Sequence, residues 1–253
     1  MRSTLRIAIL MCDELAGNPK KEHGSIGNFY RKFLEAGAQK LEESGLHKRP
    51  NIEYFFYDVV IKQEYPNIRE IDAVFMTGSR HDSFTSGSNN WILKLVDFTK
   101  SLLHEQSRVR IMAVCFGHQI VGRAYGETAE RNTLGWEVSV TSVTLSETGK
   151  RVFGCDSLAL HQMHRDVVRR YPASVKKLGH SDRCEVQGIY VTNRVMTLQG
   201  HPEYDATIAC ELLERRRGSV LDEATYRDGI DRVHHPHDGV LVGAAFLWFL
   251  IKE

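Results

Sequence analysis

The chain has 253 residues, 42% of them hydrophobic and 26% charged, which fits one large folded domain and excludes a disordered protein. Its 33 Lys and Arg residues nearly balance its 32 Asp and Glu residues. The formal net charge of +1 therefore gives no electrostatic reason to expect binding to nucleic acid or to an anionic membrane surface.

The first half of the chain alternates apolar runs with helical patterns. Runs rich in β-formers cover residues 5–11, 51–60, 71–76 and 109–114. Between them, residues 28–41 and the stripe Trp91, Leu95, Phe98 and Leu102 follow a helical period. This alternation predicts an α/β fold with an open, mostly parallel sheet of buried strands and helices on both faces. Ligands are expected at the carboxyl ends of the strands.

The second half is richer in strands. Expected strands lie within residues 135–147, 157–160, 185–191 and 195–198. The chain turns helical again from Asp205, and the arginines at 215–217 are interpreted as a solvated helix end. The apolar run 240–251 is far shorter than the ~20 residues of a membrane span, so a buried C-terminal helix is expected. No linker or repeat divides the chain, which predicts a single domain, residues 1–253, with a β-rich insertion in its second half.

Cysteine and histidine spacing predicts no metal site. The five cysteines are odd in number and contain no CxxC pair, so neither a disulfide framework nor a zinc ribbon is expected. Proline interrupts the histidines at 234–237, and His161 and His164 lack further ligands at metal-binding spacing. Asp13 and Glu14 stand where a signal peptide would have small residues, so we expect a cytoplasmic location.

Cys115 is the one cysteine whose neighbours indicate chemistry. The fourth expected strand runs into AVCFGHQ at 113–119, and residues 120–125 look helical, so Cys115 is predicted on a strand-to-helix turn. Such a turn lifts a side chain into the crevice, and the helix N-terminus favours the reactive thiolate. An isolated cysteine at a strand end is otherwise a small buried residue. The functional interpretation therefore depends on partners elsewhere in the chain.

Two other expected strand ends supply such partners. LQGHPEYD, residues 198–205, follows the last strand, and its Glu203 is placed to orient and charge-stabilise the His201 imidazole. MTGSRHDSF, residues 76–84, follows the third strand, where exposed amides together with that of Phe116 would form an oxyanion hole. These clusters predict a Cys/His/Glu triad. Residues 13–27, expected as a polar loop at the same sheet edge, would cover the site.

These residues resemble class I glutamine amidotransferases, whose nucleophile turn reads GxCxGHQ and whose base segment reads HPE. The likeness covers about residues 50–210 and implies a flavodoxin-like class I glutaminase fold. It implies that Cys115 is the nucleophile, His201 the general base and acid, and Glu203 the orienting carboxylate. The remaining roles that it implies are oxyanion amides from Gly78 and Phe116 and substrate contacts from Ser79, Gln119, Met163, His164 and Asp166.

The sequence also departs from the family pattern. Ala113 replaces the usual glycine two residues before the nucleophile, Ser79 replaces the second glycine of the oxyanion turn, and Arg165 stands where many members have glycine. TGSxxDS and QxHRD look most like the free-standing branch related to plant γ-glutamyl peptidases.

The resemblance therefore implies cysteine-dependent hydrolysis of a small-molecule γ-glutamyl amide, either glutamine or a peptide such as glutathione, through a γ-glutamyl thioester. No metal or organic cofactor is expected. Three alternatives remain open. These are a glutaminase subunit that delivers ammonia to a separate synthetase, a catalytically silent binding or regulatory subunit, and a cysteine hydrolase acting on a substrate without a glutamyl group.

Overall fold

The fold is taken from a computed structural model that describes residues 4–85, 90–106 and 108–252. The outer ends of the expected single domain, residues 1–3 and 253, lie outside the described residues. The main strands are β1 (Leu5–Met11), β2 (Ile52–Asp58), β3 (Ala73–Met76), β4 (Arg110–Val114), β6 (Glu137–Leu145), β7 (Ser157–His164), β11 (Gly188–Val191) and β12 (Val195–Leu198). Short strands are β5 (Ala129–Arg131), β8 (Asp166–Val168), β9 (Lys176–Lys177) and β10 (Gly179–His180). The helices are α1 (Gly17–His23), α2 (Ile26–Glu43), α3 (Asn90–His104), α4 (Phe116–Ala124), α5 (Glu147–Phe153), α6 (Ala206–Arg216), α7 (Glu223–Arg232) and α8 (Gly239–Ile251).

The central sheet confirms the predicted fold class. Its strand order is β2-β1-β3-β4-β12-β11-β9. The first five strands of that order are mutually parallel. Strand β11 pairs antiparallel with β12, and β9 pairs antiparallel with β11. The carboxyl ends of β1, β3, β4 and β12 therefore meet at one edge, as parallel connections require.

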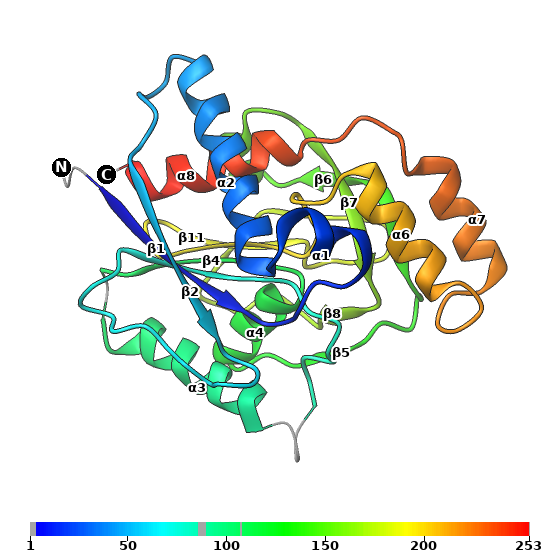
Figure 1. The fold of residues 1–253 in the computed structure, drawn as a ribbon, viewed down its shortest axis with the longest axis horizontal. Coiled ribbons are helices and arrows are strands. Elements are labelled where there is room, and N and C mark those ends of the chain that lie inside the picture. Colours follow the sequence, from blue (N-terminus) through cyan, green and yellow to red (C-terminus); the bar gives the residue numbers. More distant parts are fainter. Residues whose placement is uncertain (1–3, 86–89, 107, 253) are drawn as a thin grey trace.

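Helices cover both faces of this sheet (Figure 1). On one face, α2 and α8 pack against Ile9, Phe75 and their neighbours. On the other face, α3 and α4 pack against a second buried cluster that includes Val74 and Ile111. Helices α2 and α8 approach very closely, because a Cβ atom at Gly37 would lie 2.3 Å from the main chain of Gly243. This contact needs glycine, and it fixes where α2 crosses the sheet.

The strand-rich second half forms a smaller layer beside the sheet. Strands β6 and β7 pair antiparallel, and β10 extends them. Helices α6 and α7 pack on this layer around Val138, Met163 and Leu213. An isolated bridge between His161 and His201 joins β7 to the segment after β12. The insertion therefore borders the carboxyl edge of the main sheet. Single-domain organisation stays a prediction.

Three local expectations were wrong. Residues 13–27 are not a continuous loop, since they contain α1, a helix without buried residues that leaves no apolar period in the sequence. Strand β2 is not buried, because it forms the sheet edge and leaves Phe55 and Phe56 exposed. Helix α5 interrupts a segment that was expected to hold strands, and it begins at a side-chain cap on Ser146.

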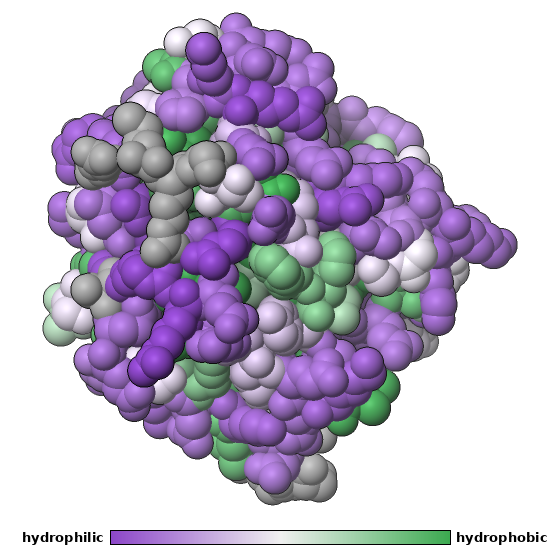
Figure 2. All heavy atoms as spheres, turned by 60° about the vertical axis from the view of Figure 1, so that its left-hand side comes forward, coloured by the Kyte–Doolittle hydropathy of each residue, from purple (hydrophilic) through white to green (hydrophobic). Residues whose placement is uncertain are grey.

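The face shown in Figure 2 is largely hydrophilic, with small hydrophobic patches between polar side chains. Within the described ranges, no helix combines the length and apolar character that crossing a membrane would require.

Candidate active site

Cys115 occupies a sharp turn between β4 and α4. Its backbone angles, φ 48° and ψ −108°, lie in the left-handed half of conformational space, which side-chain-bearing residues rarely adopt. The Cys115 amide donates a hydrogen bond to the carbonyl oxygen of Leu198, 2.9 Å away, which ties the turn to the end of β12. A Cβ at Gly117 would lie 2.6 Å from the carbonyl oxygen of Met76, so glycine lets α4 begin directly beside β3. The structure thus gives Cys115 the strand-turn-helix setting expected for it.

His201 and Glu203 follow β12 and face each other. The ring Nδ1 of His201 lies 2.7 Å from Oε1 of Glu203, and both side chains are buried. Burial lowers the pKa of His201, but the charges of Cys115 and Glu203 and hydrogen bonds to both residues outweigh it and raise the pKa to about 10. At neutral pH the ring therefore carries a positive charge beside the sulfur. A protonated histidine beside a cysteine is a pairing typical of reactive cysteines.

The titration of His201 gives a direct test of its contact with Cys115. In the unmodified protein the ring should stay protonated through neutral pH and lose its proton only as pH rises through about 10. In Cys115→Ala, the negative partner and its hydrogen bond are gone, so the pKa of His201 should fall. Nitrogen-15 NMR titration of the histidine rings measures both values. An unchanged titration in the variant would show that Cys115 and His201 do not interact.

The turn after β3 places Gly78 against the His201 ring. A Cβ at Gly78 would lie 2.8 Å from Cε1 of His201, so glycine is needed for this close approach. The Gly78 amide donates to the hydroxyl of Tyr30, 2.9 Å away. Among the described residues, no group accepts a hydrogen bond from the amides of Ser79 or Phe116. The Gly78 amide, which was expected in the oxyanion hole, is thus engaged by Tyr30, whereas the amides of Ser79 and Phe116 remain available as donors.

The residues expected to hold substrate divide into two groups. Ser79 and Met163 line the same cavity as His201. Gln119 is buried on the first turns of α4, and its side-chain amide donates to the main-chain oxygen of Asp166, 2.9 Å away. The structure thus joins Gln119 to the segment after β7, while Ser79 and Met163 lie beside the histidine.

The other two expected substrate residues are engaged in ion pairs. The Asp166 carboxylate lies 3.2 Å from the Arg131 guanidinium, yet burial outweighs this attraction and raises the pKa of Asp166 to about 6. The His164 ring lies 2.9 Å from the carboxylate of Glu137. Both side chains are therefore held in place by contacts within the protein.

A cavity of about 220 Å³ opens beside His201. Its wall is formed by the segment after β1, the turn after β3, α2 and α6. Its charged lining consists of Asp13, Glu14, Arg80, Glu211, Arg215 and Arg216. The segment expected to cover the site does reach it. The end of α6, however, is not only a solvated helix end, since two of its arginines face the cavity.

Comparison with known proteins identifies the family of the chain. The family model for glutamine amidotransferase class I matches residues 28–216, most of the chain. The chain belongs to this family. It is 30% identical over 255 residues to a glutamine amidotransferase-like protein of Schizosaccharomyces pombe, a match that covers 97% of this chain and 98% of the relative. It is also 30% identical over 214 residues to gamma-glutamyl peptidase 3 of Arabidopsis thaliana, with 81% of this chain and 80% of the relative covered. A glutamine amidotransferase from Thermotoga maritima shares the fold, with a TM-score of 0.70 at 16% identity over 98% of this chain and 99% of that chain.

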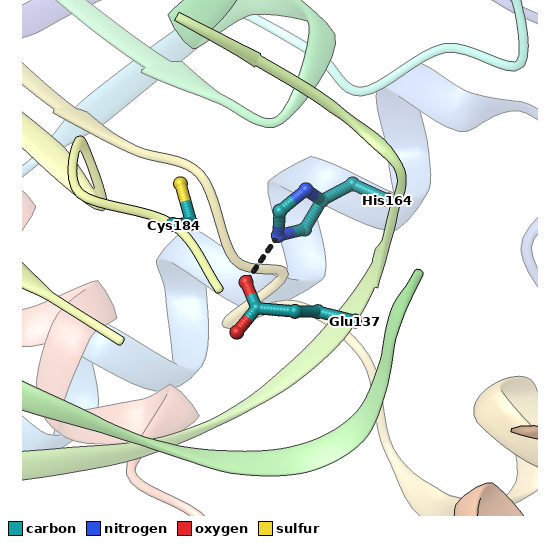
Figure 3. Close-up of side chains that lie close together, drawn as sticks. All are labelled: Glu137, His164 and Cys184. Atoms are coloured by element: carbon teal, nitrogen blue, oxygen red, sulfur yellow. Dashed lines mark ion pairs between the residues drawn. The ribbon is translucent and has the colours of Figure 1, made fainter. Parts of the chain in front are cut away.

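Within the part of the chain that the structure describes, this class I amidotransferase holds one buried cluster with metal-ligand chemistry, formed by Glu137, His164 and Cys184 (Figure 3). The carboxylate oxygens of Glu137 already have protein partners. One carboxylate oxygen of Glu137 accepts from Ser181 at 2.6 Å, and the other lies within 3.0 Å of both His164 and Gln187. Burial raises the pKa of Cys184 well above its ordinary value, so that thiol keeps its proton. The cluster therefore fits a hydrogen-bonded pair of Glu137 and His164 better than a metal centre.

Two aromatic residues of the site were not singled out by the sequence pattern. Tyr204 stacks on the His201 ring, with centroids 4.1 Å apart and planes 7° from parallel. Tyr204 directly follows the HPE segment, so its position in the sequence could have indicated that it lies near His201. Tyr30 lies on α2 and contacts both Gly78 and Glu203. No local motif marks Tyr30, because only packing of α2 on the sheet brings it to this edge.

Proposed function

We propose that this protein hydrolyses a γ-glutamyl amide through a covalent γ-glutamyl thioester on Cys115. The observation that carries the proposal is the contact between Cys115, a buried residue with a strained backbone, and His201. Glu203 bonds to the His201 ring and raises its pKa. Family membership and the similarity to a gamma-glutamyl peptidase support the same substrate class.

In the proposed reaction, the Cys115 thiolate attacks the δ-carbonyl carbon of the substrate. The amide of Phe116 and the turn that begins at Gly78 stabilise the developing oxyanion. Because the Gly78 amide donates to Tyr30, the Ser79 amide is the free donor of that turn. Gln119, Met163, His164 and Asp166 are proposed to hold or shape the site for the glutamyl group.

His201 moves the protons. Its imidazolium donates a proton to the departing amine, which leaves the glutamyl group bound to sulfur. The neutral ring then takes a proton from water, the hydroxide attacks the thioester carbonyl, and glutamate leaves as the thiolate re-forms. Glu203 keeps the ring in the orientation that both steps need. The proposed reaction uses no metal or organic cofactor.

The cavity beside His201 favours a peptide over glutamine as the substrate. Ammonia, the leaving group of glutamine, needs little room, whereas a cavity of about 220 Å³ beside His201 leaves space for a larger leaving group. The cavity wall carries side chains of both signs, among them Asp13, Arg80 and Glu211, which complement the charged ends of a peptide. We therefore propose glutathione or a similar γ-glutamyl peptide as the preferred substrate class. The cytoplasmic location stays a prediction of the N-terminal sequence.

Glutamate release from glutathione should exceed release from L-glutamine when both are supplied at equal concentration. The measurement is an enzyme-coupled glutamate assay on the purified protein. Faster release from glutamine would point instead to a subunit that supplies ammonia to a separate synthetase. Release from neither would contradict hydrolysis by the isolated chain and favour the silent-subunit interpretation.

A further inference from the structure

Tyr30 places one hydroxyl between two parts of the active site that come from distant segments. The residue lies on α2, and its side chain is buried. Its oxygen lies 2.6 Å from Oε1 of Glu203 and 2.9 Å from the amide nitrogen of Gly78. A single side chain thus connects the carboxylate of the proposed triad to the turn after β3.

The directions of these two hydrogen bonds are set by their chemistry. The Gly78 amide is only a donor, so the hydroxyl accepts from it and must give its own hydrogen to Glu203. Burial and the neighbouring carboxylate raise the pKa of Tyr30 well above its ordinary value, so the phenol remains protonated. The bond to Glu203 is therefore a short hydrogen bond to a charged acceptor, which is one of the stronger kinds.

Glu203 depends on this bond because only one of its two carboxylate oxygens has hydrogen-bond partners among the described residues. Oε1 accepts from both His201 and Tyr30. Oε2 is buried, and no described group donates to it. Without the Tyr30 hydroxyl, Glu203 would keep only its bond to His201, and the carboxylate would be free to rotate about its side-chain torsions.

The packing of Tyr30 needs only its ring. The ring lies 5.6 Å from the centroid of Phe29 and 5.2 Å from that of Phe75, contacts that a phenylalanine would also make. The hydroxyl alone reaches Glu203 and Gly78. Its two bonds therefore point to a role in the reaction beyond the packing of α2.

We propose that Tyr30 is a positioning residue for the γ-glutamyl transfer. Its hydroxyl holds Glu203 in the orientation that aligns His201, and it holds the Gly78 amide so that the next amide of the turn faces the substrate carbonyl. Tyr30 also lines the cavity beside His201, but the role proposed for it acts through Glu203 and Gly78 and rests on the proposed function. The two halves of the site, base and oxyanion turn, are aligned by one group.

Tyr30→Phe tests this role. We expect kcat to fall about 10- to 100-fold, the range typical of partners that orient a reacting group, with KM changed by less than about twofold. The proton on Nδ1 of His201, which bonds to Glu203, should shift its NMR resonance in the variant. The matched control is Tyr54→Phe, which removes another buried phenol hydroxyl that has no partner among the described residues. The control should match the unmodified protein in both measurements.

The outcomes separate this inference from the proposed function. An unchanged kcat with an unchanged His201 resonance overturns the role of Tyr30, and so does a raised KM at constant kcat. If the unmodified protein releases no more glutamate than Cys115→Ala, the proposed function fails, and the resonance alone decides whether Tyr30 positions the pair. If thermal unfolding shows that Tyr30→Phe is not folded, fluorotyrosine at position 30 keeps the ring and strengthens the donor. An unchanged His201 resonance with fluorotyrosine then overturns the inference.

Discussion

Replacing Cys115 by alanine should abolish glutamate release and leave the protein folded. The thiolate forms the covalent bond to the glutamyl carbonyl, and no step of the proposed reaction bypasses it. Loss of a nucleophile of this kind reduces kcat by about 10⁴- to 10⁶-fold. Glutamate release from glutathione gives the rate, and thermal unfolding checks the fold.

A second cysteine provides the control for this loss. Cys155 lies between α5 and β7, does not line the cavity beside His201, and is only partly buried. Cys155→Ala should keep the full rate. Rapid quenching of the unmodified protein with substrate, followed by mass spectrometry, should find one glutamyl group on the peptide that contains Cys115. A substantial rate in Cys115→Ala would mean that the nucleophile lies elsewhere.

Changing Glu203 to glutamine should reduce kcat by about 10²- to 10⁴-fold, the second-largest effect expected. The carboxylate charge raises the pKa of His201, and Oε1 accepts the Nδ1 hydrogen. An amide of the same shape preserves packing but removes the charge, and it places an NH₂ group where Oε2 has no described partner. The imidazolium then loses much of its stabilisation.

The matched control is Glu223→Gln. Glu223 is an exposed carboxylate that pairs with Arg217 and Arg227 at the surface, and it does not line the cavity beside His201. Steady-state kinetics should show no change for this control. An equal rate for Glu203→Gln and the unmodified protein would remove the carboxylate from the proposed mechanism.

The parallel sheet was predictable because each of its strands carries its own signal. Residues 5–11, 71–76 and 109–114 are apolar runs with turn residues after them, and alternation with helices implies parallel pairing. Parallel pairing then brings the three strand-end clusters together, so the proximity of Gly78, Cys115 and His201 followed from topology. Helix α1 could not be predicted, because a helix that buries no side chain leaves no apolar periodicity in the sequence.

Tyr30 was beyond the reach of local patterns. It stands 173 residues before Glu203, and its contact depends on the angle at which α2 crosses the sheet. That angle depends in turn on the glycines at which α2 and α8 touch. Similarly, nothing in the spacing of Glu137 and His164 indicates that β6 and β7 place them opposite each other in register. Such contacts are properties of tertiary packing, and sequence periodicity carries no record of them.

The backbone conformation at Cys115 lowers the stability of the fold while it presents the thiol needed for catalysis. A residue with a side chain pays roughly 1–3 kcal/mol to hold φ at 48°, whereas glycine adopts positive φ readily. A chain with glycine at this one position would therefore gain stability and lose its thiol. A protein whose only task was to bind a partner would have no use for the strained cysteine, so the backbone of the turn itself weighs against a silent subunit.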